Sequence, residues 1–260
     1  MDPLDRGFTL GDGLFETMRV RGGAVPHIER HLSRLRVGAA VLELSPLPKD
    51  ESLKDAIGKT LAANELAEAA VRLTISRGVP ENRGLLPEPE PKPSLVIHAE
   101  PFAGYPAELY DRGARALISR IPRNERSPLA RIKSLNYLDN VLARREAEAR
   151  GADDALLLNT AGDLASASAA NLFLLLDGAL ITPSVTSGAL PGTVRELVVA
   201  DLAPRVGLEV VERAVRPEEL RAAEEALLTN ALMGIVPLIE VDALPIGTGE
   251  PGPVFTLLGT

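Results

Sequence analysis

Residues 154–183 constrain the fold more than any other stretch of the chain. They read DALLLNTAGDLASASAANLFLLLDGALITP, in which short apolar segments alternate with turn residues. Asp177-Gly178 is a dipeptide typical of two-residue β-hairpin turns, and TAGD at 160–163 supplies a second turn signal. The apolar segments between the turns are too short for helices, so the pattern predicts successive strands.

The rest of the chain alternates helix-like and strand-like segments. In the first part, GLFETMRVRGGAVPHI predicts a hairpin around Gly22-Gly23. Helical spacing recurs at 27–42 and 50–66, with Asp50 or Ser52 as the N-cap of the second helix. The further predicted helices are 137–151, 192–207 and 217–225, and the further predicted strands are 70–78, 92–102, 112–122, 208–215, 226–230 and 236–246.

This order predicts an α/β (α+β) protein of two parts. We expect a small N-terminal α/β domain at 1–120, an interdomain loop at 121–127 and a larger C-terminal domain at 128–260. Two such halves would leave a cleft between them, which is a common place for a small-molecule site.

Composition excludes several classes of function. The net charge is −8, which argues against nucleic acid or an acidic membrane surface as a partner. The chain has no cysteine and only three histidines, so disulfides and thiolate metal sites are excluded and no zinc site is expected. His27 and His31 are four residues apart on a predicted helix and favour a solvated face. No apolar run has transmembrane length and no signal peptide is recognisable, so we expect a cytoplasmic protein.

Lys133 is the first candidate catalytic residue. It lies in ARIKSLNYLDNVLA, between a loop and a helix. Partial burial at such a junction would lower the pKa of its amine and suit Schiff-base chemistry. A lysine that extends to the surface is the commoner explanation for this pattern.

Three further segments could bind an anion. SGALPGTVRELVV places Gly192, Thr193 and Val194 at a helix N-terminus, where free amides and the helix dipole attract phosphate. LLTNALMG ends a strand at Asn230, where unpaired amides follow. Arg34 lies beside His31 on the polar side of the helix predicted at 27–37. Ordinary helix caps at Gly192–Thr193 and Asn230, and a solvated position for Arg34, are the alternatives.

Seven segments in consistent order resemble the fold type IV pyridoxal-phosphate (PLP) enzymes, the class IV aminotransferase family. They are LDRGFTLGDGLFETMRV, ERHLSRL, ISRG, IKSLNYLDNVLARREA, SASAANLFLL, LPGTVREL and LLTNALMGIVPL. The family includes aminodeoxychorismate lyase and the branched-chain and D-amino-acid aminotransferases. The resemblance implies a homodimer with PLP in the cleft between its two domains.

The resemblance also implies roles for individual residues. Lys133 would form the Schiff base with the cofactor and move the Cα proton of the substrate. Tyr137 would hydrogen-bond the ring oxygen of the cofactor. The residues implied at its phosphate are Arg34, Gly192, Thr193, Val194, Asn230 and Ala231. Arg77 and Arg83, in the SRG and NRG segments, would bind substrate.

Three features depart from the family pattern. The glutamate that pairs with the cofactor's pyridine nitrogen normally stands five residues before the Asn of NLF, and here that position is Ser166. Val194 and Ala231 replace threonines that contact the phosphate in several relatives. The usual first hairpin strand and last helix are not recognisable, which suggests clipped ends. Asp163 is a substitute carboxylate that strand alternation disfavours, because positions 163 and 166 of a regular strand face opposite ways.

The segments divide between two reactions. NALMGIVP and the SRG and NRG arginines resemble aminodeoxychorismate lyase, which makes 4-aminobenzoate and pyruvate for folate biosynthesis. KSLNYLDNVLA resembles the transaminases of D-amino or branched-chain amino acids. We favour the lyase, with the transaminase as the alternative. A pseudo-enzyme that binds cofactor without turnover is the third possibility, which Ser166 supports and Lys133 opposes.

Overall fold

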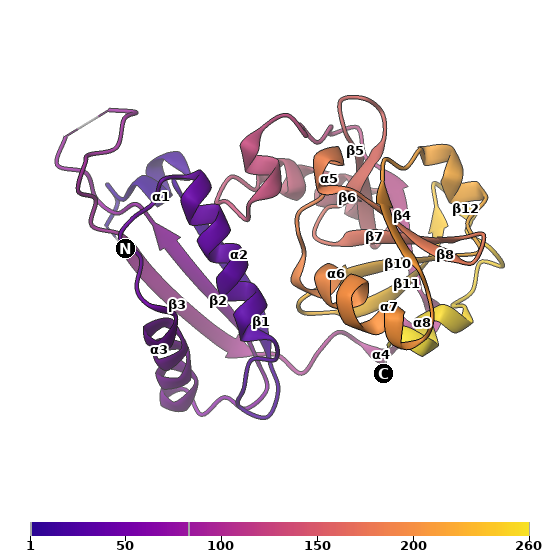
Figure 1. Cartoon of the computed structure of the whole chain (residues 1–260), viewed down its shortest axis with the longest axis horizontal. Helices are drawn as coiled ribbons and strands as arrows, with labels where there is room; N and C mark the ends of the chain where they lie inside the picture. Colours follow the sequence, from indigo (N-terminus) through magenta and orange to yellow (C-terminus); the bar gives the residue numbers. More distant parts are fainter. Residues whose placement is uncertain (1, 83, 260) are drawn as a thin grey trace. The chain divides into compact units, whose positions relative to one another are not determined.

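The computed structural model describes residues 2–82 and 84–259, which form two compact units (Figure 1). Unit 1 runs to Gly104 and also takes in Ile132–Asn136, whereas unit 2 comprises Tyr105–Arg131 and the chain from Tyr137 onward. This division differs from the predicted boundary at 120 and the predicted loop at 121–127. The reason is β4 (Ala114–Ile118), which pairs with strands of unit 2.

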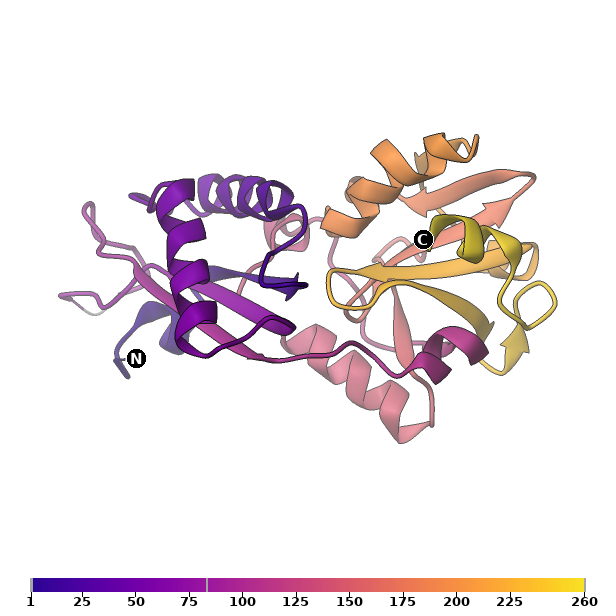
Figure 2. The same ribbon diagram turned by 90° about the horizontal axis from the view of Figure 1, so that it is seen from below.

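Unit 1 is an antiparallel sheet covered by helices. Its strands, in the order β1-β2-β3, are β1 (Gly13–Val20), β2 (Ala69–Ser76) and β3 (Ser94–Pro101). Its helices are α1 (Arg6–Leu10), α2 (Ile28–Val41) and α3 (Asp50–Ala63). Alternate residues of β1, including Leu14 and Met18, are fully buried with Leu32 and Leu35 of α2. Figure 2 shows α2 lying along the sheet.

Two local predictions for unit 1 were wrong. Gly22 and Gly23 do form a tight turn, closed by a bridge between Arg21 and Ala24. However, the chain then enters α2, and β1 pairs with β2 instead of a hairpin partner. The N-cap of α3 is Lys49, so Asp50 and Ser52 lie inside the helix.

Unit 2 contains a nine-stranded sheet. Along its path the order is β6-β5-β4-β11-β10-β7-β8-β9, and β12 pairs with β11. The turn at Asp177-Gly178 has positive φ at both residues and joins two antiparallel strands, as predicted. The strands beyond β4 are β5 (Asp154–Leu158), β6 (Leu164–Ala167), β7 (Asn171–Leu176), β8 (Ala179–Pro183), β9 (Val210–Arg213), β10 (Glu225–Asn230), β11 (Gly234–Val241) and β12 (Leu244–Pro245).

The helices of unit 2 cover separate apolar clusters. Helix α5 packs Ala143 and Ala147 on Ala155 and Leu157 of β5. One helical run, 193–205, packs on a cluster that contains Phe173 and Leu227. That run consists of α6 (Thr193–Leu197), the π-helical η3 (Val198–Leu202) and α7 (Ala203–Arg205). The other helices are α4 (Ala107–Arg112), η1 (Pro128–Arg131), α5 (Leu138–Ala149), η2 (Val185–Ser187), η4 (Pro217–Arg221) and α8 (Pro253–Leu258).

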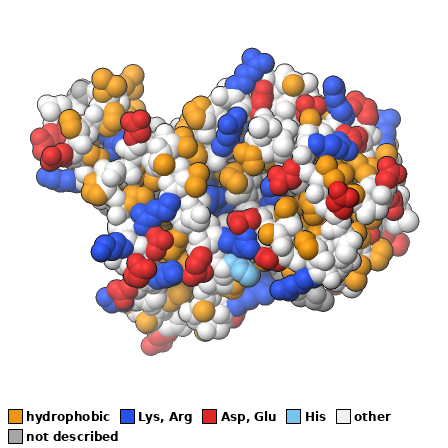
Figure 3. All heavy atoms as spheres, in the orientation of Figure 1, with side chains coloured by type: hydrophobic (Ala, Val, Ile, Leu, Met, Phe, Trp, Pro, Cys, Tyr) orange, Lys and Arg blue, Asp and Glu red, His pale blue; other side chains and the backbone are white. Residues whose placement is uncertain are grey.

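Charged side chains of both signs are mixed on one face of the molecule. On the face shown in Figure 3, acidic and basic side chains are interspersed, without a large patch of one sign. Among the described residues, no helix is long and apolar enough to cross a membrane. Nor do the described His, Asp and Glu residues gather into a group that could hold a metal ion.

Candidate cofactor site

Lys133 belongs to a short extended segment that pairs with the edge of β1. The amide of Phe15 donates to the Lys133 carbonyl over 2.9 Å, and the amide of Leu135 donates to the Gly13 carbonyl over 3.0 Å. Because side chains alternate along an extended segment, Ile132 and Ser134 are buried while Lys133 faces the other way. Its Nζ lies 4.4 Å from the centroid of the Phe15 ring, within cation–π range. The partial burial expected of Lys133 is therefore present.

Arg34 is not on a solvated face. Its Nε donates to Oε1 of Glu16 over 2.8 Å, and its Nη2 donates to Oε2 over 2.6 Å. Nδ1 of His31 lies 2.7 Å from the same Oε2. The solvated face expected of His31 was wrong, and the solvated alternative for Arg34 is excluded, because a carboxylate from β1 meets this side of α2. Burial alone would raise the pKa of Glu16, but Arg34 and His31 outweigh it and hold that pKa below its usual range.

Arg77 is occupied within unit 1. Its Nε and that of Arg6 each donate to Oδ2 of Asp12 over 2.8 Å. Its Nη groups donate to the carbonyls of Leu42 and Glu43. These bonds favour a structural role over the substrate contact expected of Arg77. The other expected substrate residue, Arg83, lies outside the described residues.

In unit 2, the helical run 193–205 begins with unused amides. Gly192 is its N-cap, and the first intrahelical bond runs from the Glu196 amide to the Gly192 carbonyl. Across the described chain, the amides of Thr193 and Val194 have no acceptor. A Cβ on Gly192 would come within 1.9 Å of Oδ1 of Asn171, so only glycine lets the helix start this close to β7.

Thr229 is a candidate ligand that the sequence analysis missed. Its side chain is 1% exposed, and its hydroxyl has no hydrogen-bond partner in the described part of the chain. Thr229 pairs directly with Asn171 across β10 and β7, so their side chains lie on the same face of the sheet. Asn171 in turn touches Gly192. A buried unpaired hydroxyl costs free energy, which favours a ligand that pairs with it. The sequence does not show whether a hydroxyl is paired, so Thr229 could not be recognised from it.

Asn230 shapes the turn after β10. Its Oδ1 accepts hydrogen bonds from the amides of Leu232 and Met233, and its Nδ2 donates to the Ala169 carbonyl. This is the capping role that the sequence left open as an alternative. Ala231 opens the turn and carries no side-chain donor. Along β10, Asn230 faces away from Thr229, so the two side chains serve opposite faces of the strand.

Tyr137 is the residue before α5 and lies near Arg123. Arg123 donates to the Ala130 carbonyl over 2.9 Å and has longer contacts with Gly188 and Asn140. It thereby joins the loop before Lys133 to the loop before α6. Burial lowers the pKa of Arg123, and the negative charges available at Tyr137 and Asp139 only partly offset this.

Ser166 lies next to a β-bulge. On β5, Leu157 pairs with Ser166 and the next residue, Leu158, pairs with Leu164, so Ala165 is the extra residue. The Ser166 side chain is buried, and its hydroxyl has no partner among the described residues. The bulge also breaks strand alternation between Asp163 and Ser166, and Asp163 precedes the first residue of β6. Strand alternation therefore does not decide between Asp163 and Ser166, and Oδ1 of Asp163 lies 3.2 Å from Nε of Arg216.

Comparisons with known proteins agree with one another. The family described as "Amino-transferase class IV" matches residues 13–241. The chain belongs to the class IV aminotransferase family. A putative branched-chain-amino-acid aminotransferase of Methanocaldococcus jannaschii is 35% identical over 96% of this chain and 86% of its own length.

Two solved structures of the family superimpose on the whole chain. The 4-amino-4-deoxychorismate lyase of Pseudomonas aeruginosa matches with a TM-score of 0.89 at 31% identity, over 100% of this chain and 93% of its own. A branched-chain amino acid aminotransferase from T.th., solved with pyridoxamine 5'-phosphate, matches with a TM-score of 0.90 at 27% identity, over 100% and 89%. The predicted fold type IV family, its mixed α/β fold and its enzymatic nature are thus confirmed.

Class IV aminotransferases use PLP, and the residues of this chain fit it. The free amides of Thr193 and Val194, the close approach at Gly192 and the unpaired hydroxyl of Thr229 together make a cradle for a phosphate. Lys133 supplies the amine that a cofactor aldehyde requires. Thr229 supplies a side-chain hydroxyl donor in unit 2, whereas the side chains of Val194 and Ala231 have none.

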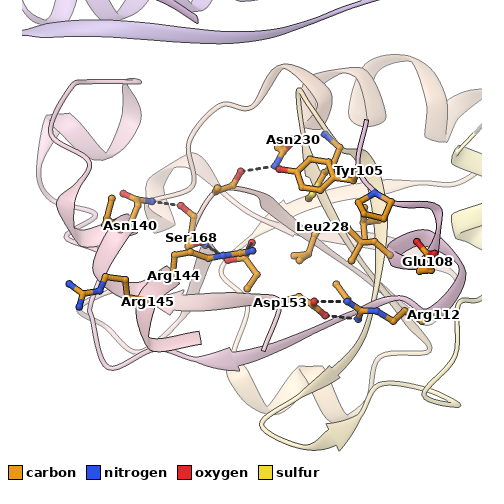
Figure 4. Close-up of a pocket in the computed structure, with 18 of the residues that line it drawn as sticks. Tyr105, Glu108, Arg112, Asn140, Arg144, Arg145, Asp153, Ser168, Leu228 and Asn230 are labelled. Atoms are coloured by element: carbon orange, nitrogen blue, oxygen red, sulfur yellow. Dashed lines mark hydrogen bonds and ion pairs between the residues drawn. The ribbon is translucent and has the colours of Figure 1, made fainter. Parts of the chain in front are cut away.

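A cavity of 640 Å³ lies within unit 2, and Tyr137 is among the residues that line it (Figure 4). Leu228 and Asn230 line it, so it lies on the opposite face of β10 from Thr229. Asp154 also lines it and accepts hydrogen bonds from the amide and hydroxyl of Ser168, while Nη1 of Arg144 lies 3.6 Å away. Burial raises the pKa of Asp154, and these contacts do not cancel the effect.

Replacement of Asp154 by asparagine is expected to stabilise the protein at neutral pH. When a carboxyl has a higher pKa in the folded protein than in the unfolded chain, the protein loses stability as the pH rises. The loss begins near the pKa in the unfolded chain, 3.8, and is complete above the pKa in the folded protein. Asp154→Asn keeps an acceptor for Ser168 and removes that loss, for a gain of about 1 kcal/mol in the free energy of unfolding at pH 7. Urea unfolding from pH 4 to pH 8 measures it.

The adjacent Asp153 is the matched control. Burial raises the pKa of Asp153, but hydrogen bonds from Arg112 and the Arg115 amide outweigh this and leave it lowered. Asp153→Asn should therefore reduce stability at pH 7. Equal losses in both variants would contradict the assignment of a raised pKa to Asp154.

Proposed function

We propose that this protein is an aminodeoxychorismate lyase, which converts aminodeoxychorismate to 4-aminobenzoate and pyruvate. The observation that carries the proposal is the unpaired Ser166 hydroxyl at the position of the ring-pairing glutamate. A carboxylate there favours a protonated pyridine nitrogen, whereas a neutral hydroxyl can donate to an unprotonated one. Electron withdrawal should then be weaker, which a transaminase tolerates poorly. The lyase gains driving force from its aromatic product.

Each residue has a defined task in this proposal. When bound, PLP withdraws electrons from the substrate carbon that carries the amine. Lys133 holds the cofactor and then takes the proton from that carbon. The amides of Thr193 and Val194, with the Thr229 hydroxyl and the Arg34 guanidinium, bind the phosphate. Tyr137 donates to the ring oxygen, and Ser166 faces the ring nitrogen.

An amino-acid transaminase is the second candidate. The similarity to the putative branched-chain-amino-acid aminotransferase of M. jannaschii supports it, as does the KSLNYLDNVLA segment around Lys133. A binding protein without turnover is disfavoured by membership in an enzyme family. The homodimer, the cytoplasmic location and the part in folate biosynthesis belong to the same proposal as the lyase.

One pair of assays separates the two reactions. The PLP-loaded protein is given aminodeoxychorismate, and 4-aminobenzoate and pyruvate are quantified. Separately, it is given D-amino and branched-chain amino acids with 2-oxoglutarate. The proposal expects equal amounts of 4-aminobenzoate and pyruvate, with slower transamination. Rapid transamination without 4-aminobenzoate would overturn it in favour of the transaminase.

A further inference from the structure

We propose that Arg195 is a positioning residue, which fixes the direction of the backbone amides that bind the phosphate of the cofactor. The inference rests on the assignment of the Thr193 and Val194 amides to that phosphate in the proposed function. It adds that phosphate affinity depends on a guanidinium that anchors the first turn of the helical run 193–205 to two strands. Every contact that supports it lies within unit 2.

Arg195 joins the start of the helical run to β8 and β9. It follows the N-cap Gly192 by three residues and is 5% exposed. Its Nη2 donates to the carbonyl of Pro183, the last residue of β8, over 3.1 Å, and to Oε2 of Glu212 on β9 over 2.5 Å. These two strands are adjacent and parallel. One side chain therefore holds the first helical turn against both strands.

The short α-helical part of the run makes such an anchor useful. Helix α6 has only five residues and continues as the π-helical η3. A single α-helical turn is marginal by itself, because its formation fixes several backbone dihedral angles for few hydrogen bonds. The loop before the run has its own restraint, since Nδ2 of Asn171 donates to the Leu190 carbonyl over 2.8 Å. Arg195 supplies the corresponding restraint after Gly192, within the first turn.

Stability alone explains Arg195 poorly. Its Nε is buried and has no hydrogen-bond partner in the described part of the chain, and an unsatisfied buried donor costs free energy. Well-packed apolar residues often replace a buried ion pair without loss of stability. A methionine could fill the same space without an unsatisfied donor. The arginine instead makes two hydrogen bonds of defined direction, as orientation of the helix start requires.

The direction of the amides matters because a phosphate is bound by several donors at once. Thr193 and Val194 are the two residues before Arg195, so a rotation of the first turn moves both of their amides. Donors that are already aligned bind an anion with a smaller loss of conformational entropy. A turn without its anchor would still carry both amides, but in more than one direction. Arg195 should therefore affect the affinity for a phosphorylated ligand more than that for the same ligand without phosphate.

The test compares two cofactor forms that differ only in phosphate. Apoprotein variants are titrated with PLP and with pyridoxal, and the dissociation constants are read from the absorbance of the bound aldehyde. Arg195→Met should weaken PLP binding about tenfold, because the first turn loses both anchoring hydrogen bonds. Arg195→Lys, which can still pair with Glu212, should weaken it less. Pyridoxal binding should change little in either variant.

Arg213→Met is the matched control, because Arg213 follows Glu212 on β9 and pairs with Glu219. It should leave both dissociation constants unchanged. Equal weakening of PLP and pyridoxal by Arg195→Met would indicate a purely structural role and overturn the proposal, as would unchanged PLP binding.

Glu212→Gln provides the decision if Arg195→Met does not fold. The Glu212 side chain is 42% exposed, so its replacement should not disturb the core. The amide still accepts a hydrogen bond from Arg195 but without the charge, and PLP binding should weaken about threefold with little change for pyridoxal. Unchanged PLP binding, or equal weakening of both forms, would again overturn the proposal.

The same titrations separate this inference from the proposed function. If the unaltered protein binds PLP no more tightly than pyridoxal, the phosphate cradle is wrong and the inference fails with it. A loss confined to PLP in Arg195→Met supports the inference whether the enzyme is a lyase or a transaminase, because the titration involves no turnover.

Discussion

Lys133→Ala is expected to lose at least about 1000-fold in activity, because no other amine can take over both cofactor attachment and proton transfer. Borohydride reduction of the yellow PLP-loaded parent should fix the cofactor to Lys133. The chain has four other lysines, Lys49, Lys54, Lys59 and Lys92, so peptide mapping assigns the label without ambiguity.

Lys59→Ala is the control for this experiment, because Lys59 is an exposed lysine paired with Asp55 on α3. It should keep full activity and full labelling of Lys133. Label on another lysine of the reduced parent, or a colourless protein after reconstitution with PLP, would show that the assignment of Lys133 is wrong.

Ser166→Glu is expected to raise transaminase activity about tenfold or more, since a carboxylate near the pyridine nitrogen strengthens electron withdrawal in a buried site. The rate of keto-acid formation from the amino-acid panel measures this. Ser166→Ala, which removes the hydroxyl without adding charge, should not show the gain. The ratio of transamination to 4-aminobenzoate formation is the informative quantity, because it cancels differences in cofactor loading.

Asp163 provides the opposing outcome. The bulge at Ala165 interrupts strand alternation between Asp163 and Ser166, so alternation does not exclude Asp163 as a partner of the ring nitrogen. If Ser166→Glu changes nothing while Asp163→Asn abolishes activity, Asp163 is the ring partner. Arg216→Gln should then also alter activity, because it removes the cation 3.2 Å from the Asp163 carboxylate.

Local signals predicted much of the fold. Asp177-Gly178 adopts the positive φ values its residue types favour, and the strands on either side follow from their apolar runs. In contrast, β4 was assigned to the wrong part of the chain, because a strand of five residues does not reveal its partners. Its pairing with β11 depends on residues that lie far along the chain, at 238–241.

The candidate site was predictable where it consists of motifs and unpredictable where it depends on contacts. Lys133, Gly192 and Thr193 came from recognisable segments. The buried state of Arg34 did not, since its partner Glu16 comes from a strand that precedes the helix. The bulge before Ser166 and the unpaired Thr229 hydroxyl arise from pairing between strands, which alternation within one strand cannot reveal.

The five residues Ile132–Asn136 have a consequence for recombination. They complete unit 1 by pairing with β1, yet the chain on both sides of them belongs to unit 2. A chimera of two relatives joined at residue 104 would therefore take β1 from one parent and the Lys133 segment from the other. Successful chimeras between relatives should need two further junctions, around 131 and 137, so that Lys133 is inherited together with the strand edge that holds it.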